Sequence, residues 1–227
     1  MLPIRRSILS FLKSSCLILG VVSSATAQDS LLAVQKRPWL NGVRIGVDLF
    51  SLGKAFYQNT FPQYDLTADL GIKRFFLEVN YGYNTSSIKG DNYEYESKGS
   101  YTRIGIAYNL IKERTAKNVV FVGVRGCWAD FGDKTHFTIQ SKQWGSHDEE
   151  IQRERVHHRW AELAAGVRVY IWKNIYLGYG IQYKIRLQPD QSDHLEAYYT
   201  PGYGLNDKKS ISFTYYLLYR IPFIKTK

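Results

Sequence analysis

Two adjacent histidines, His157 and His158, are the residues best suited to chemistry, and Ser146 and His147 lie shortly before them. A histidine hydrogen-bonded to a serine and a carboxylate can activate the hydroxyl for attack on an ester, as in lipid-modifying hydrolases and acyltransferases. The nearby carboxylates are Glu149, Glu150 and Glu154. Such a triad needs its groups within about 3 Å of one another, and no nucleophile motif with a defined spacing is present. We predict solvated loop residues and no catalytic residues, with a surface lipid hydrolase as the alternative.

The histidines as a group could in principle form a metal site, since all lie in or beside two long polar stretches: His136, His147, His157, His158 and His194. Their spacing matches no known set of metal ligands, and consecutive residues of a strand, such as His157 and His158, point to opposite faces. No Walker-type or dinucleotide-binding glycine pattern occurs. We therefore predict no metal, no cofactor and no nucleic acid partner.

Tyrosines in the same polar stretches offer a further candidate site: Tyr93, Tyr95, Tyr198, Tyr199 and Tyr203. Exposed tyrosines in loops can recognise a protein or a glycan. Amphipathic rings also collect where a membrane meets water. We favour the membrane interpretation and keep the recognition surface as the alternative.

The first 27 residues resemble a secretory signal peptide. Arg5, Arg6 and Lys13 precede a short apolar run and a small-residue stretch that ends in Ala25-Thr26-Ala27. We predict cleavage after Ala27 and a single mature domain at 28–227. The alternative, a lipoprotein acylated at Cys16, is less favoured because Lys13 interrupts the apolar run.

Cleavage removes three cations and no carboxylate, so the net charge falls from +10 to +7. An anionic partner such as the phosphates of lipopolysaccharide would suit that charge, but basic loops and arginines inside the fold explain it equally well. Cys127 is the one cysteine left after cleavage, so no intramolecular disulfide can form.

Eight segments of the mature chain alternate between apolar and polar or small residues, which is the pattern of a strand with two different faces. They are 43–50, 64–72, 75–83, 103–110, 120–128, 160–171, 175–187 and 211–221. The connections between them are alternately short and long, with long ones at 54–63, 85–99, 132–156 and 188–209. This pattern predicts an all-β, eight-stranded antiparallel up-and-down transmembrane β-barrel with short periplasmic turns and long extracellular loops.

The composition of the two rows decides which one faces outward. Each strand has one row of apolar residues and one row of polar or small residues. The polar row is rich in glycines and in charged residues that include Arg44, Arg103, Arg125 and Arg168. Glycines between long paired side chains can fill the narrow interior of an eight-stranded barrel, whereas a soluble carrier barrel would have its apolar row inside. We predict that Glu78, Glu162 and the aspartates of this row pair with the arginines in a connected interior network.

Aromatic residues near the strand ends predict two belts at the membrane surfaces. One belt comprises Trp39, Tyr108, Trp172, Tyr176 and Tyr219, and the other comprises Tyr64, Tyr83, Tyr101 and Trp128.

Several short motifs resemble an uncharacterised family of small outer-membrane β-barrel proteins of Bacteroides-type Gram-negative bacteria. They are Gly46-Val47-Asp48-Leu49-Phe50, Tyr101-Thr102-Arg103-Ile104-Gly105, Trp160-Ala161-Glu162, Gly166-Val167-Arg168, Pro201-Gly202-Tyr203-Gly204 and Ile221-Pro222-Phe223. The resemblance implies a fold and an outer-membrane location, and it supplies no catalytic residues. One departure is that four residues follow Phe223, whereas barrels of this class commonly end on an aromatic residue.

Together these patterns predict a monomeric, non-enzymatic integral outer-membrane barrel without an open pore, which contributes to envelope stability or presents loops to partners. The expected partners are outer-membrane lipids including lipopolysaccharide, and a protein or glycan at the loops. A surface lipid hydrolase and a secreted soluble ligand carrier remain the alternatives.

Overall fold

The structure is a computed structural model that describes residues 40–57, 63–90, 93–112, 117–141, 145–187, 197–205 and 207–223. All of them belong to the unit Arg37–Lys227. The predicted signal peptide at 1–27, Trp39, His194 and the residues after Phe223 lie outside the described residues.

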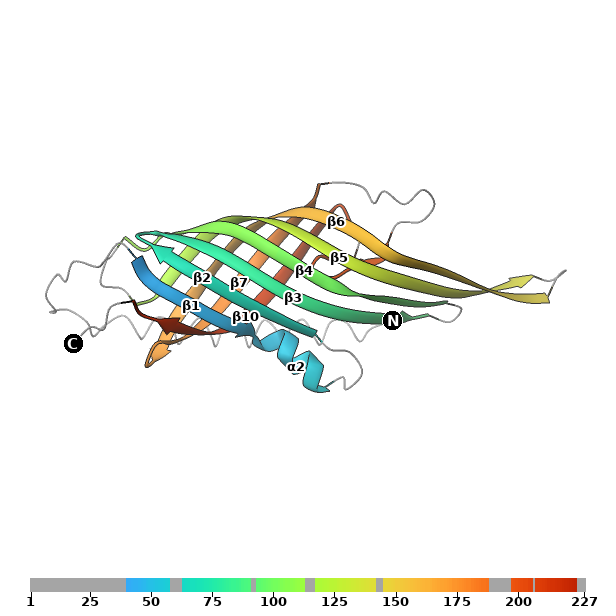
Figure 1. The fold of residues 1–227 in the computed structure, drawn as a ribbon, viewed down its shortest axis with the longest axis horizontal. Coiled ribbons are helices and arrows are strands. Elements are labelled where there is room, and N and C mark those ends of the chain that lie inside the picture. Colours follow the sequence, from blue (N-terminus) through green and yellow to red (C-terminus); the bar gives the residue numbers. More distant parts are fainter. Residues whose placement is uncertain are drawn as a thin grey trace, which may run out of the picture. The chain divides into compact units, whose positions relative to one another are not determined.

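Eight antiparallel strands form a closed ring, as the alternation predicts (Figure 1). Around the ring, each strand pairs with its neighbours in the chain, and the last strand pairs with the first, so that Val43 lies opposite Ile221. The strands are β1 (Leu40–Asp48), β2 (Gln63–Ile72), β3 (Phe75–Lys89), β4 (Tyr93–Asn109), β5 (Val119–Ser141), β6 (Gly145–Trp172), β7 (Ile175–Arg186) and β10 (Lys209–Ile221).

One rim of the ring, here called the turn rim, carries the tight connections. The turn between β2 and β3 contains Lys73 with φ 55°, and the turn between β6 and β7 contains Lys173 and Asn174 with φ 41° and 70°. In the second of these turns, left-handed backbone at both positions matches the twist of the strands that it joins. The opposite rim, here called the loop rim, carries the long connections.

The loop rim is more regular than the sequence indicates. Helix α2 (Leu49–Tyr57) follows β1 directly, because Asp48 accepts hydrogen bonds from the Phe50 N–H (3.1 Å) and the Ser51 hydroxyl (2.9 Å) and so caps the helix. The last connection contains a small hairpin, β8 (Tyr199–Thr200) and β9 (Gly204–Leu205). Within the described residues no helix is both long and apolar enough to span a membrane.

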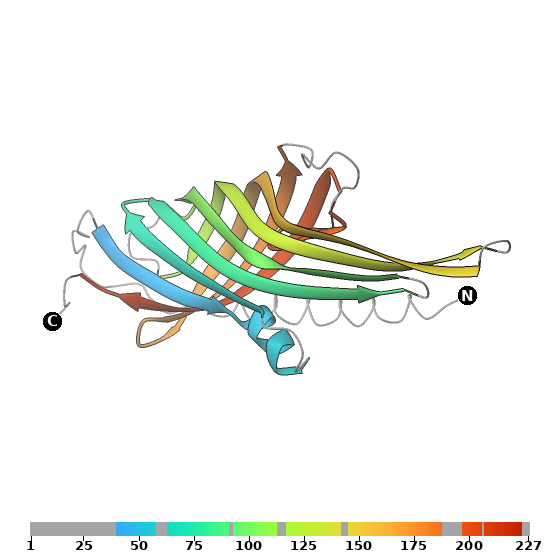
Figure 2. The same cartoon turned by 45° about the vertical axis from the view of Figure 1, so that its right-hand side comes forward.

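The predicted loops at 85–99 and 132–156 are largely strand. Residues 84–89, 93–99, 131–141 and 145–157 continue β3, β4, β5 and β6 beyond the ring as a twisted sheet, here called the arm (Figure 2). Polar pairs cross its strands, including Lys134 with Glu150 (2.9 Å) and Thr138 with Asp148 (2.7 Å). Tyr95, Phe131 and Val156 are buried at the base of the arm. Beyond that base the side chains are mostly polar and backbone pairing holds the strands, which explains why the sequence pattern there resembles a loop.

The apolar row faces outward along the ring, as predicted. Leu77, Ile106 and Phe213 are 43%, 53% and 57% exposed, whereas Arg103 and Arg168 on the other row are 4% and 6% exposed. In β5 the apolar Val119 and Phe121 make the alternation less regular. The structure assigns its faces, because Val122 and Val124 face outward while Phe121 and Arg125 face inward. The barrel therefore has a polar, charged interior and an apolar outer wall.

Candidate functional site

The barrel interior holds a continuous chain of ion pairs that begins near the turn rim. Arg44 of β1 contacts Asp69 of β2 at 2.8 Å, and Arg168 of β6 reaches the same carboxylate at 3.2 Å. Arg168 also pairs with Glu78 of β3. Side chains from four strands thus meet in the middle of the barrel.

The chain of ion pairs continues toward the loop rim. Arg125 lies 2.8 Å from Glu78 and 3.7 Å from Glu162. Arg103 lies 3.7 Å from Glu162 and 2.9 Å from Asp65. Four arginines and four carboxylates alternate along this chain, so its formal charges cancel. The predicted interior network is confirmed, and we call it the ion ladder.

Burial makes the ion ladder depend on complete pairing, because a charge that is removed from water without a partner is strongly unfavourable. Aromatic rings add to the pairing: the guanidinium carbon of Arg44 lies 4.4 Å from the ring centre of Phe76, and that of Arg168 lies 4.5 Å from that of Phe121. A Cβ on Gly105 would approach the Cγ of Arg125 to 2.5 Å. Two cavities next to these contacts have volumes of about 50 and 20 Å³.

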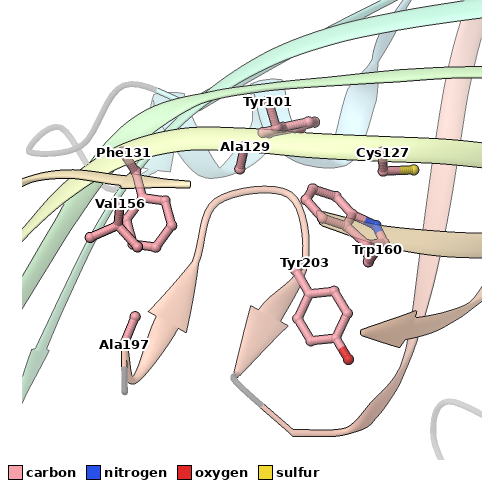
Figure 3. Packing of buried hydrophobic residues seen from close by; sticks show 8 residues of the cluster. All are labelled: Tyr101, Cys127, Ala129, Phe131, Val156, Trp160, Ala197 and Tyr203. Atoms are coloured by element: carbon pink, nitrogen blue, oxygen red, sulfur yellow. The ribbon is translucent and has the colours of Figure 1, made fainter. Parts of the chain in front are cut away.

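Above the ion ladder, the β8–β9 hairpin folds into the mouth of the barrel, where it forms a plug (residues 197–205). The Nζ of Lys184 donates to the carbonyls of Gly202 (2.6 Å) and Tyr203 (3.1 Å). Tyr203 is 1% exposed and its ring meets that of Trp160 edge-on, with 5.7 Å between the ring centres (Figure 3). Trp160 in turn donates from its indole nitrogen to Glu162 at 2.8 Å, which joins the plug to the ion ladder.

Three of the five candidate recognition tyrosines are buried or half-buried, which corrects both interpretations for these three. Tyr95 and Tyr203 are buried and Tyr199 is half-buried, while Tyr93 and Tyr198 are exposed. Burial, and then the charge of Asp133, raise the pKa of Tyr95, so its hydroxyl stays protonated and donates to that carboxylate at 2.9 Å. Tyr199 accepts a hydrogen bond from Asn84 at 2.7 Å. These tyrosines fix the plug to the base of the arm.

The two adjacent histidines face opposite sides of the wall, as strand geometry predicts. His157 is exposed and its Nδ1 contacts the carboxylate of Asp130. His158 is buried and its Nδ1 lies 2.8 Å from the hydroxyl oxygen of Thr200 in the plug. The candidate residues therefore divide between an outer surface and the barrel mouth.

Neither histidine forms a serine triad among the residues that the structure describes. Ser100 lies opposite Asp130, which lies opposite His157, so the carboxylate stands between the other two groups on the outward face. Two strand spacings separate Ser100 from His157 by roughly 10 Å, too far for proton transfer between them. His147 lies 3.9 Å from Glu149 on the arm. The side chain of Ser146 lies outside the described residues.

No group of three histidine, cysteine or carboxylate side chains in the described ranges could hold a metal ion. His136 and His147 are exposed on the arm, apart from the two histidines of the ring. Because His194 lies outside these ranges, the absence of a metal site stays a prediction.

A family model described as "Domain of unknown function (DUF6048)" matches residues 4–226, almost the whole chain. The chain belongs to the DUF6048 family. The prediction of an uncharacterised family is thereby confirmed. The Bacteroides-type source and the outer-membrane location stay predictions, because the description of DUF6048 states neither.

Other comparisons add little to the DUF6048 assignment. No match was found among the curated proteins. The chain is similar to a crystal structure of the N-terminal β-barrel domain of OprF from Pseudomonas aeruginosa, with 13% sequence identity, a TM-score of 0.31, and coverage of 79% of this chain and 98% of that chain.

Two of the predicted belt aromatics of this DUF6048 chain lie inside the barrel. Tyr101 and Tyr176 are 3% and 2% exposed, and Tyr101 donates to Asp65 at 2.9 Å. Both belong by their spacing to the charged row, so the alternation itself assigns them inward. The outward members at the loop rim include Tyr64 and Trp128, and those at the turn rim include Trp172 and Tyr219.

Sequence reasoning missed the plug and the side chains that hold it. Lys184 is recognisable as an inward residue of β7, but its acceptors are backbone carbonyls, which no residue type reveals. The one available signal was Pro201-Gly202-Tyr203-Gly204, a turn sequence in which Gly202 and Gly204 have φ 76° and 110°.

Proposed function

We propose that this chain is a monomeric, non-enzymatic integral barrel of a Gram-negative outer membrane, exported by the segment 1–27, without an open pore. The observation that carries the proposal is the inverted distribution of polarity: aliphatic side chains cover the outer wall, and paired ions fill the interior. Its role is to stabilise the envelope or to present the arm to a partner.

The outer wall supports a lipid environment. Val124, Leu163 and Ile211 are 59%, 54% and 60% exposed, among the highest values of the outward row. In water, such a surface would cost roughly 25 cal/mol for each Å² left exposed, whereas acyl chains solvate it. A closed ring without free strand edges also hydrogen-bonds the backbone N–H and C=O groups of its strands to one another. This pairing is needed because hydrocarbon offers these groups no hydrogen-bonding partner. A soluble ligand carrier would need the opposite arrangement, with the apolar row around a central cavity.

The filled interior supports the absence of a pore. The ion ladder crosses the barrel, and the plug covers it at the loop rim through Lys184 and His158. Eight strands enclose a space only about wide enough for their own side chains. We propose that nothing larger than water enters.

A non-enzymatic role is supported by the order of the outward polar groups. Asp130 separates Ser100 from His157, so the hydroxyl lacks a base within reach. The inward histidine, His158, contacts Thr200 under the plug, where a lipid ester has no access. A surface hydrolase is therefore the weaker proposal.

The arm is the region best suited to a protein or glycan partner. It extends four strands beyond the ring and exposes alternating charges, such as Lys134 beside Glu150. Residues 147–152 of β6 are exposed without exception. A charged strand edge of this kind resists self-association and leaves the surface available for a specific partner.

Expression of the full chain in a Gram-negative host tests the proposal. We expect the mature protein in the outer-membrane fraction, soluble only with detergent, and migrating faster on a gel before boiling than after it, because a closed barrel resists detergent until heated. Recovery of the processed protein from the periplasm without detergent, with no heat-dependent shift, would overturn the proposal.

A further inference from the structure

The lipid-facing wall is interrupted by a groove along β5 and β6. On the outward row of β5, valines and Trp128 are separated by Gly126, which lies opposite Ala161 of β6. The absence of two large side chains leaves a cavity of about 510 Å³, which extends from Gly126 past Trp128 and Leu187 to His157. The backbone carbonyl of Arg159 accepts from the N–H of Leu187 at 3.1 Å and thereby fixes the far wall of the groove.

Packing within the chain does not explain Gly126. A Cβ at Gly105 or Gly166 would approach a neighbouring backbone oxygen to 2.2 or 2.3 Å, but a Cβ at Gly126 would meet nothing within 4 Å. Its φ is not in the left-handed range either. Glycine inside a strand costs roughly 0.5–1 kcal/mol relative to alanine. A molecule that fills the groove would account for a glycine at this position.

The end of the groove nearest the loop rim is polar and cationic. Asp130 and His157 form a close pair there, 57% and 63% exposed, and Arg159 follows on the same outward row. The Nδ1 of His157 faces Asp130, so its Nε2 edge is the one available to a ligand. In the parts of the chain that the structure describes, Arg159 has no ion pair. The groove therefore joins an apolar trough to a guanidinium and an imidazole.

We propose that this groove binds one lipid A molecule of lipopolysaccharide, with a phosphate at Arg159 and His157 and an acyl chain across Gly126. The inference rests on the proposed function, with the loop rim on the extracellular side, in the leaflet that contains lipopolysaccharide. An arginine fork matches two phosphate oxygens, and the exposed imidazole of His157 lines the same groove.

Native mass spectrometry of the mature protein in dodecylmaltoside micelles, titrated with lipid A, tests this site. We expect one bound lipid A per protein, and affinity about tenfold lower for Arg159→Gln, because a charged hydrogen-bonding group is lost. Gly126→Leu, which fills the trough, should lower the affinity similarly. The matched controls are Lys112→Gln, which removes a cation at the turn rim, and Val122→Leu, which enlarges the same wall outside the groove; both should bind as the wild type does.

Two further ligands separate the two parts of the site. One is dephosphorylated lipid A, and the other is inorganic phosphate alone. We expect both to bind at least tenfold more weakly than lipid A, because each lacks one half of the interaction. Equal binding of dephosphorylated lipid A would overturn the role of Arg159 and His157, and equal binding by the Gly126→Leu variant would overturn the acyl position.

A gel shift on heating, measured for each variant, distinguishes the two proposals. A variant that shows the shift is a folded barrel. If such a variant binds lipid A as the wild type does, the result contradicts the lipid A site but not the proposed membrane barrel. Absence of the shift in the wild-type protein would contradict the proposed function as a membrane barrel, and the proposed lipid A site would fall with it.

Discussion

A Cβ placed on Gly82 would lie 2.1 Å from the Cζ atom of Tyr101, closer than any atom of that ring could tolerate. The ring has little freedom to move away. Its hydroxyl donates to Asp65 at 2.9 Å, and the guanidinium carbon of Arg103 lies 4.7 Å from its centre. Gly82 is therefore the space into which an interior tyrosine fits, next to the end of the ion ladder.

Gly82→Ala should destabilise the barrel by about 1–3 kcal/mol, because the added methyl group displaces Tyr101 from Asp65. Unfolding by guanidinium in detergent micelles, followed by tryptophan fluorescence, measures the change. The control is Gly126→Ala, where open space receives the methyl group and stability should stay the same or rise slightly. Equal destabilisation by the two substitutions would contradict the assignment of the inward and outward rows.

Glu78→Gln should be more damaging, at about 3–5 kcal/mol, because it removes the carboxylate that Arg125 and Arg168 share. The temperature at which the unboiled protein loses its fast gel migration should fall accordingly. Glu94→Gln, at an exposed ion pair with Lys89 on the arm, should leave that temperature unchanged. A Glu78→Gln barrel as heat-resistant as the wild type would show that the ion ladder is dispensable.

Single-channel recording in a planar bilayer should give no conductance steps for the wild type. The same result is expected when residues 197–205 are replaced by a glycine-serine linker, since the ion ladder still fills the interior beneath the plug. Steps in the wild type would contradict the closed interior. Steps confined to the linker variant would assign the seal to the plug instead.

Overproduction of the chain should leave the lipid profile of the host unchanged, as measured by mass spectrometry of extracted lipids. The wild type, His157→Ala and the double variant His157→Ala, His158→Ala should give the same profile as an empty vector, because among the described residues His157 contacts Asp130 and no hydroxyl nucleophile. A lysolipid or newly acylated species that appears with the wild type and disappears with His157→Ala would establish an enzyme.

The sequence predicts the ring well because a period of two is a local property of each strand. Leu77, Ile106 and Arg103 lie on the predicted faces. The set of ionic residues inside the barrel follows from the same alternation, which also assigns Tyr101 inward against the predicted aromatic belt. The individual pairs do not follow, because Arg168 meets Glu78 from ninety residues away only through the strand tilt and register of the closed ring.

The loop rim was harder to predict because its contacts combine backbone atoms with distant side chains. Beyond its buried base the strands of the arm carry mostly polar side chains, so their sequence is like that of a loop although their backbones pair. The plug depends on Lys184 binding two carbonyls, and the groove on the absence of a side chain at Gly126. Residue types alone report none of these relationships.

Collision accessibility of spin labels tests most directly whether lipid surrounds the outward row. In a Cys127→Ser background, labels at Val124 or Phe213 of the protein in phospholipid vesicles should collide with oxygen far more than with a water-soluble nickel chelate. A label at Gln152 on the arm should show the reverse. High access of the nickel chelate at Val124 and Phe213 would contradict a membrane-spanning wall and the account built on it.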